Sequence, residues 1–154
     1  MVSVGKRLGW CVVLAAAWIG PVAGIDASDS SLLSQLLEAI RQVESRGGRD
    51  TRGDGGRSLG SYHISRAYWA DGCRQLKREG VGNVPWDYDR WVHNDAQARR
   101  VIRGYWRRYA APRYAPDSMA DCEVLARVHN GGPTGHRKSS TAKYWRRVRR
   151  AMND

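Results

Sequence analysis

A glycine-rich polar segment divides this chain and limits what it can fold into. The segment runs from Gly47 to Gly60 and reads GGRDTRGDGGRSLG. Glycine loses more conformational freedom in a helix than any other residue, so the segment cannot continue a helix. We expect turns or a small β-hairpin there instead. The residues before and after this segment show helical periodicity. The sequence therefore predicts a mostly helical α+β domain with a small β element between its first two helices.

Apolar residues at three- and four-residue steps predict five helices. Each predicted helix has a capping residue or a breaker near an end. The predicted starts are Asp29 or Ser30, Ser65, Asn94 with Gln97, Ser118 with Asp121, and the region just before Tyr144. The predicted ends are Gly47–Gly48, Arg78, the segment up to Pro112 and Pro116, Gly131–Pro133, and Met152. Residues 79–93 show no periodicity and are expected to be irregular.

The N-terminal residues have the order of a secretory signal peptide. Lys6 and Arg7 precede the apolar run 11–19, and small residues follow up to Gly24. Positive charge, a short apolar stretch and small residues are the three parts of such a signal. We expect cleavage after Gly24, which leaves residues 25–154 as a single secreted domain. No apolar run reaches the length of about 18 residues that a transmembrane helix needs.

The two cysteines of the expected mature chain are Cys73 and Cys122. An even number of cysteines in an oxidising compartment predicts one disulfide. In the chain-entropy description, its loop of about 50 residues is worth about 3–4 kcal/mol. No C-x-x-C pattern is present and the four His residues lack a repeating ligand spacing, so we expect neither a metal site nor a cofactor.

Two carboxylates, Glu44 and Asp54, stand in contrasting sequence environments. Glu44 lies in the last turn of the first predicted helix, where the helix dipole and apolar neighbours favour the protonated form and raise its pKa. Asp54 lies in an open glycine turn, where a carboxylate should stay ionised. A protonated and an ionised carboxyl group are the equipment for cleaving a glycosidic bond. Asp50 competes with Asp54 for the second role.

Several ordered motifs resemble the invertebrate-type lysozymes, the destabilase family. They extend from about Leu33 to Met152, and HNGGP-x-G followed by SST-x-x-YW is the most specific. The motifs are VES (43–45), LGSYHI (59–64), AYWADGC (67–73), YWRRYA (105–110), DCEVLARVHNGGPTG (121–135) and SSTAKYWRRV (139–148).

The resemblance implies a lysozyme-like fold and hydrolysis of the β-1,4 link between N-acetylmuramic acid and N-acetylglucosamine. It implies Glu44 as proton donor and Asp54 as nucleophile or ion stabiliser. The implied substrate-binding residues are Ser65, Arg66, Ala67, Tyr68, Trp69, Ala70, Asp71, Tyr105, Tyr109, His129, Asn130 and Gly131. Aromatic faces suit sugar rings, although core packing explains Trp69 and Tyr105 equally well.

The chain departs from the family pattern in three places. It keeps only Cys73 and Cys122, both at family cysteine positions, where the family is normally cysteine-rich. The segment between Glu44 and Leu59 is shorter than usual, so the match of Asp54 depends on gap placement. His63 replaces the Gln that is usual before the strand-ending Ile.

A strong positive charge points to an acidic partner. The chain has 26 Lys and Arg against 15 Asp and Glu, a net charge of +11. We expect a monomer attracted to bacterial peptidoglycan and its anionic wall polymers. A solvated helix face is the plain alternative for the arginines, and no nucleic-acid-binding motif is present.

Three other activities remain open at this point. A destabilase-type isopeptidase would use groups such as His129, Ser139, Ser140 and Lys143. A lytic transglycosylase would need Glu44 alone. A non-enzymatic, wall-binding antibacterial protein would need neither carboxylate.

Overall fold

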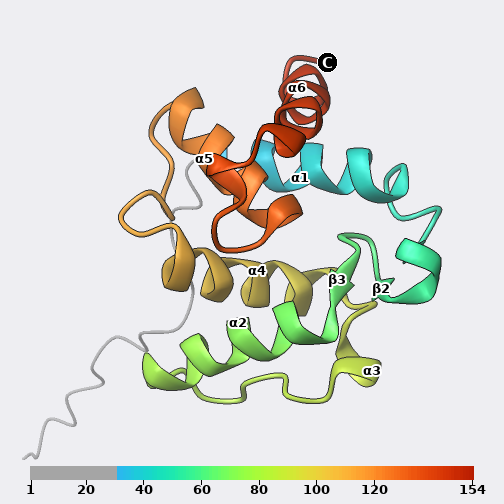
Figure 1. Cartoon of the computed structure of the whole chain (residues 1–154). Coiled ribbons are helices and arrows are strands. Elements are labelled where there is room, and N and C mark those ends of the chain that lie inside the picture. Colours follow the sequence, from blue (N-terminus) through green and yellow to red (C-terminus); the bar gives the residue numbers. More distant parts are fainter. Residues whose placement is uncertain (1–30) are drawn as a thin grey trace, which may run out of the picture.

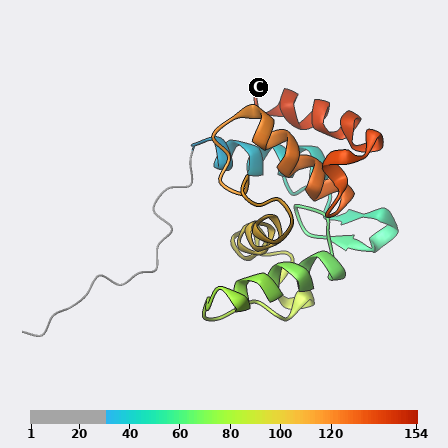
Figure 2. The ribbon, with the colours of Figure 1, turned by 60° about the vertical axis from the view of Figure 1, so that its left-hand side comes forward.

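The computed structural model describes residues 31–154, so the predicted signal peptide and the first helix's predicted cap lie outside the described residues. Helices α1, α5 and α6 form one group, α2 and α4 form another, and the small sheet lies beside both (Figures 1 and 2). The helices are α1 (Ser31–Ser45), α2 (Arg66–Arg78), α3 (Tyr88–Trp91), α4 (Asp95–Tyr109), α5 (Met119–Gly131) and α6 (Ala142–Ala151). Three short 3-10 helices are η1 (Asp54–Gly56), η2 (Gly135–Arg137) and η3 (Ser139–Thr141).

The predicted β element is a three-stranded antiparallel sheet in the order β1-β2-β3. Its strands are β1 (Arg52–Gly53), β2 (Ser58–Leu59) and β3 (Ile64–Ser65). Arg52 pairs with Leu59, and Leu59 pairs in turn with Ile64. Glycine turns separate strands of only two residues, which is why the element stays small.

The predicted helix starts at Ser65, Asn94 and Ser118 are confirmed. Each side-chain oxygen accepts a hydrogen bond from the backbone N–H three residues later, which satisfies a donor that the helix leaves free. The region 79–93 is not wholly irregular as expected, because it contains α3. Asp87 caps that single turn by accepting a hydrogen bond from the N–H of Arg90, but four residues are too few to show a helical period.

Helices α2 and α4 approach each other closely through two glycines. A Cβ at Gly72 would lie 2.4 Å from the carbonyl oxygen of Val101, and one at Gly104 would lie 2.6 Å from the carbonyl oxygen of Gly72. No side chain fits at either position without moving the backbone. The glycine pair therefore sets the spacing of the two helices that carry the aromatic residues of the site.

The predicted Cys73–Cys122 disulfide is wrong, because both residues are free, buried thiols. Cys73 lies on α2 and Cys122 on α5, and α4 runs between these two helices (Figure 1). The Cys73 thiol instead donates to the carbonyl oxygen of Pro85 at 3.4 Å. Burial raises the pKa of each thiol to about 11, so both behave as small apolar side chains in the core.

Candidate active site

A cleft of about 410 Å³ lies where α1, the sheet, α2, α4 and α5 meet. It brings together side chains from four separate stretches of the chain. Both predicted catalytic carboxylates line it, together with seven of the predicted binding residues: Ser65, Ala67, Tyr68, Asp71, Tyr105, His129 and Asn130.

Glu44 lies in the last turn of α1 as predicted, and only 15% of its side chain is exposed. Two histidines flank its carboxylate. Nδ1 of His63 is 3.3 Å from Oε2, and Nε2 of His129 is 3.8 Å from Oε1. These residues come from the turn before β3 and from α5, so the surroundings of Glu44 are assembled by long-range contacts.

The pKa of Glu44 is lowered, opposite to the sequence prediction. Burial does raise it, as expected, and is the largest single influence. The hydrogen bond from His63, the nearby His129 and the Tyr144 hydroxyl together outweigh burial. The prediction failed because neither histidine is close to Glu44 in the sequence, so their stabilisation of the carboxylate was not visible there.

His129 is buried, and both of its ring nitrogens have partners. Nε2 lies 3.1 Å from the carbonyl oxygen of Tyr62, and Nδ1 lies 3.1 Å from the Tyr68 hydroxyl. A carbonyl only accepts, so Nε2 carries the proton and Nδ1 accepts from Tyr68. Burial, the largest influence, lowers the pKa of His129, and the Glu44 carboxylate partly opposes it. The two hydrogen bonds hold the ring in place beside Glu44.

Asp54 lines the same cleft from an exposed position. It is exposed at the start of η1, with a backbone φ of 50°, and Oδ2 accepts a hydrogen bond from the Ser58 hydroxyl at 2.9 Å. Asp50 does not line the cleft. Its side chain is exposed, and its carbonyl oxygen and its charge both act on His63. This placement favours Asp54 over Asp50 as the second carboxylate.

An aromatic wall borders the cleft near α2 and α4. The rings of Tyr68 and Tyr105 stack with centroids 3.6 Å apart and an interplanar angle of 12°. The Tyr109 hydroxyl donates to Asp71 at 2.9 Å. Tyr105 is only 4% exposed, so it contributes to the core and to the cleft at once.

Five predicted binding residues do not line the cleft: Arg66, Trp69, Ala70, Tyr109 and Gly131. Trp69 is buried in the core, and its Nε1–H donates to the carbonyl oxygen of Pro85 at 2.7 Å. Arg66 pairs with Asp89 and lies over the Tyr88 ring. A helix presents one face to the cleft, so α2 contributes Ala67, Tyr68 and Asp71 and turns the intervening residues elsewhere.

Tyr109 and Gly131 are neighbours of lining residues. Tyr109 reaches the cleft through its bond to Asp71, whereas Gly132 rather than Gly131 takes part in the lining.

The prediction missed four lining residues: Ser58, His63, Gly132 and Pro133. His63 is the important one, because it touches Glu44. Its signal was an ionisable side chain between the buried Tyr62 and Ile64, in the place of an expected Gln. Among residues 31–154, no cluster of three or more His, Cys, Asp or Glu is arranged to hold a metal ion.

Comparison with known proteins gives a consistent set of similarities. The profile of the Destabilase family matches residues 34–151. Lysozyme 1 of Crassostrea virginica is 38% identical over 91 residues, which cover 59% of this chain and 43% of that protein. The lysozyme of Magallana gigas is 33% identical over 59% of this chain and 58% of its own length. The chain therefore spans about half the length of these two relatives.

Other relatives align over a larger share of both chains. An invertebrate-type lysozyme of Ruditapes philippinarum is 30% identical over 79% of this chain and 83% of its own length. The crystal structure of Tapes japonica lysozyme aligns with a TM-score of 0.57 and 30% identity, covering 74% of this chain and 85% of that one. A chain in the crystal structure of Aeromonas hydrophila PliI in complex with Meretrix lusoria lysozyme gives the same TM-score at 31% identity, covering 75% and 87%.

Proposed function

The chain belongs to the destabilase family of invertebrate-type lysozymes, and from this we propose that it is a muramidase. It would hydrolyse the β-1,4 bond between N-acetylmuramic acid and N-acetylglucosamine in bacterial peptidoglycan. The single observation that carries the proposal is that Glu44 and Asp54 line one cleft. Two carboxyl groups on opposite sides of a scissile bond are what glycoside hydrolysis requires.

The two carboxylates divide the work according to their surroundings. Glu44 is sheltered and hydrogen-bonded, so it acts as the acid that protonates the glycosidic oxygen. Asp54 is exposed and polar in its contacts, so its carboxylate stabilises or attacks the sugar carbon that becomes positively charged. The resting protein favours the carboxylate form of Glu44, so catalysis requires a source for the proton that Glu44 donates.

The walls of the cleft suit an N-acetylated sugar chain. The stacked rings of Tyr68 and Tyr105 provide an apolar edge, and the exposed Asn130 amide can hydrogen-bond an acetamido group. Ser65 and the Asp71–Tyr109 pair add polar groups for hydroxyls along the same wall.

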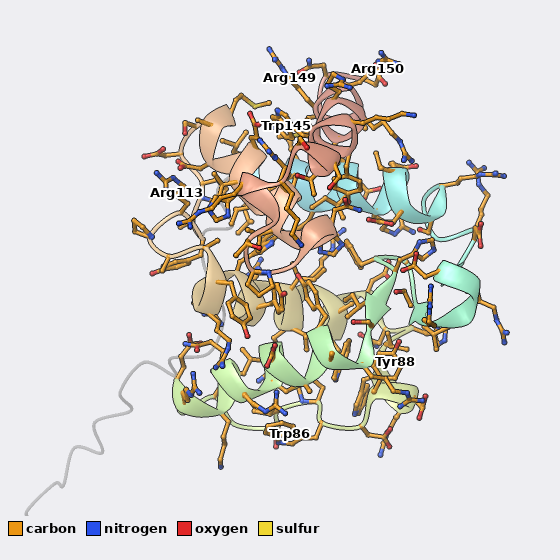
Figure 3. The ribbon with its side chains drawn as sticks, viewed as in Figure 1. Trp86, Tyr88, Arg113, Trp145, Arg149 and Arg150 are labelled. Carbon is orange, nitrogen blue, oxygen red and sulfur yellow. The ribbon has the colours of Figure 1, made fainter. Side chains whose placement is uncertain are left out.

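Secretion and attraction to anionic wall polymers are part of the proposal. No helix among residues 31–154 is long and apolar enough to cross a membrane. On α6, the exposed Lys143, Arg146, Arg149 and Arg150 have no acidic partner among the described residues. Arg149 and Arg150 extend outward from the helix (Figure 3). Such unpaired positive charge draws a protein toward the phosphate-rich bacterial wall.

The isopeptidase alternative lacks an assembled site in the structure. Ser139 and Ser140 are exposed and lie outside the cleft that contains His129. Both nitrogens of His129 already bond to Tyr62 and Tyr68, so neither is available to activate Ser139 or Ser140.

Analysis of the products from purified Gram-positive walls tests the proposal. A muramidase lowers the turbidity of the suspension and releases muropeptides with reducing ends. Anhydro-muramyl ends identify a transglycosylase, and ε-(γ-glutamyl)-lysine released from a crosslinked peptide identifies an isopeptidase. No cleavage between about pH 4 and pH 8, at low and high salt, would overturn an enzymatic role.

A further inference from the structure

His63 lies directly against the proposed acid of the cleft. Its Nδ1 is 3.3 Å from Oε2 of Glu44, and the two side chains are 13% and 15% exposed. Such limited exposure weakens the competition from water and strengthens the contact. No role in the reaction described so far uses this residue.

The other ring nitrogen of His63, Nε2, determines which protonation states the His63–Glu44 pair can adopt. Nε2 lies 3.0 Å from the carbonyl oxygen of Asp50. A carbonyl oxygen only accepts, so Nε2 must carry a hydrogen. Nδ1 then faces Glu44 either as a protonated donor to a carboxylate or as a lone-pair acceptor from a carboxylic acid. Both arrangements contain one proton between Nδ1 and Oε2.

The position of the ring is built into the backbone. His63 has a φ of 45°, and its N–H donates to the carbonyl oxygen of Gly60 at 3.1 Å. The ring packs on Gly53 of β1, where an added Cβ would lie 2.7 Å from Nδ1. The sheet thus leaves a space shaped for this imidazole, and a left-handed conformation of a non-glycine residue costs free energy that such contacts must offset.

We propose that His63 positions the Glu44 carboxyl group and shares a single proton with it, so that the pair rather than Glu44 alone supplies the acid of the cleft. The inference rests on the proposed muramidase function and deepens it. When the proton moves from Nδ1 to Oε2, an N–H bond breaks and an O–H bond forms. The ion pair becomes a neutral imidazole and a neutral carboxylic acid, and the total charge stays zero.

This proton transfer answers the question of how Glu44 becomes an acid. In the resting protein the hydrogen bond from His63 helps to lower the pKa of Glu44, while the same bond raises the pKa of His63. Between these two pKa values the pair holds one proton. Glu44 passes it to the glycosidic oxygen as the C–O bond breaks, and recovers a proton from the water that completes hydrolysis.

Other charged and titratable groups face the pair from the surrounding elements. Asp50 approaches His63 from the loop before β1, and His129 approaches from α5. Tyr144 of α6 faces Glu44, and Asp54 lines the open side of the same cleft. The two histidines differ in the nitrogen that faces Glu44: His63 presents Nδ1, which has no carbonyl partner among the described residues, whereas His129 presents Nε2, which already bonds to the Tyr62 carbonyl.

The first experiment needs no enzymatic activity. NMR titration of the imidazole nitrogens of the full chain measures the pKa of His63, assigned by its absence in His63→Gln. In Glu44→Gln the pKa of His63 should fall by about one unit, because the carboxylate that stabilises its charged form is gone. An unchanged pKa of His63 would overturn the shared proton. The signals of His93, which is exposed and outside the cleft, serve as the internal reference and should be the same in both proteins.

The second experiment separates proton sharing from simple positioning. Gln can donate a hydrogen bond to Glu44 but cannot release a proton, whereas Ala can do neither. At pH 5, His63→Gln should retain kcat/KM within about threefold of wild type. On the alkaline side of the pH profile, its activity should fall at a pH about one unit lower than that of wild type. His63→Ala should lose about tenfold throughout, because the carboxyl group is no longer held. His93→Gln is the matched control and should leave the profile unchanged.

Gly53→Ala displaces the ring while keeping the histidine. Its Cβ would collide with Nδ1, so its pH profile should shift in the same direction as that of His63→Gln. Gly82→Ala, where an added Cβ meets nothing within 4 Å, controls for the glycine substitution itself.

The outcomes distinguish this inference from the proposed function. If His63→Gln has the same pH profile of kcat/KM as wild type, His63 has only a structural role and proton sharing is wrong. If the wild-type protein cleaves no wall material, the muramidase proposal fails, and the NMR titration alone decides whether the pair shares a proton.

Discussion

The two sides of the cleft hold their carboxylates in different ways. Glu44 is enclosed by His63, His129 and Tyr144, which come from the turn before β3, from α5 and from α6. Asp54 is exposed in a glycine turn, and the partner of its side-chain hydrogen bond, Ser58, is only four residues away. The sheltered side depends on tertiary packing and the open side on local turn geometry. The neighbours of Glu44 therefore control its protonation, whereas the Asp54 carboxylate is mainly in contact with solvent.

Removal of the sheltered carboxyl group should have the largest effect. Glu44→Gln keeps the shape and a hydrogen-bonding group but cannot donate the proton, so we expect wall lysis to fall about a thousandfold. The measurement is the initial rate of turbidity loss, with thermal unfolding followed by circular dichroism as the folding control. Full antibacterial effect in this variant would instead identify a non-enzymatic, wall-binding protein.

Removal of the open carboxylate should have the next largest effect. Asp54→Asn replaces a charge that stabilises the reacting sugar, so kcat should fall about a hundredfold. Asp50→Asn is the comparison variant, because Asp50 does not line the cleft and touches His63 only through its backbone carbonyl, while its side-chain charge is the weakest of the influences that raise the pKa of His63. That variant should stay within about twofold of wild type. The reverse ranking of the two variants would assign the second role to Asp50.

Loss of a buried hydrogen bond on the sheltered side should reduce stability. In Tyr68→Phe the Nδ1 acceptor of buried His129 loses its hydroxyl donor. We expect the free energy of unfolding in urea to fall by about 1–3 kcal/mol. Tyr105→Phe is the control, because its ring stacks on Tyr68 while its hydroxyl makes no hydrogen bond to the part of the chain described. Equal losses in both variants would show that ring packing, not the bond to His129, dominates.

The pH dependence of stability should show the smallest effect. The hydrogen bond to Glu44 raises the pKa of His63 in the folded protein. This contribution is complete below the unfolded pKa of about 6.5 and is lost as the pH rises through the folded value. From about pH 6 to pH 8, wild type should therefore lose about 1 kcal/mol or less relative to Glu44→Gln. If the free energies of unfolding of the two proteins, measured by chemical denaturation, depend on pH in the same way, Glu44 does not stabilise protonated His63.

The sequence was sufficient for features that depend on neighbouring residues. Helix caps at Ser65, Asn94 and Ser118, the glycine-rich β element and the place of Glu44 at the end of α1 follow from short-range hydrogen bonding and periodicity. The ordered motifs also led to the correct family and fold. The predicted signal peptide stays a prediction, because it lies outside the described residues.

The wrong predictions for Trp69 and for the disulfide share one cause, which is packing between elements that lie far apart along the chain. The periodicity of α2 could not tell that Trp69 turns into the core while Tyr68 faces the cleft. The even cysteine count could not show that α4 separates Cys73 from Cys122. Both outcomes depend on how helices pack, which involves residues far apart along the chain.

The electrostatic character of the site was likewise decided by tertiary structure. The sequence determined that a glutamate ends a helix beside a glycine-rich turn and that the chain is strongly basic. Packing then brought His63 and His129 within 3.3 and 3.8 Å of that glutamate and reversed the expected direction of its pKa. Local interactions decay over a few residues of chain, whereas charges interact through space, so only the fold could set this balance.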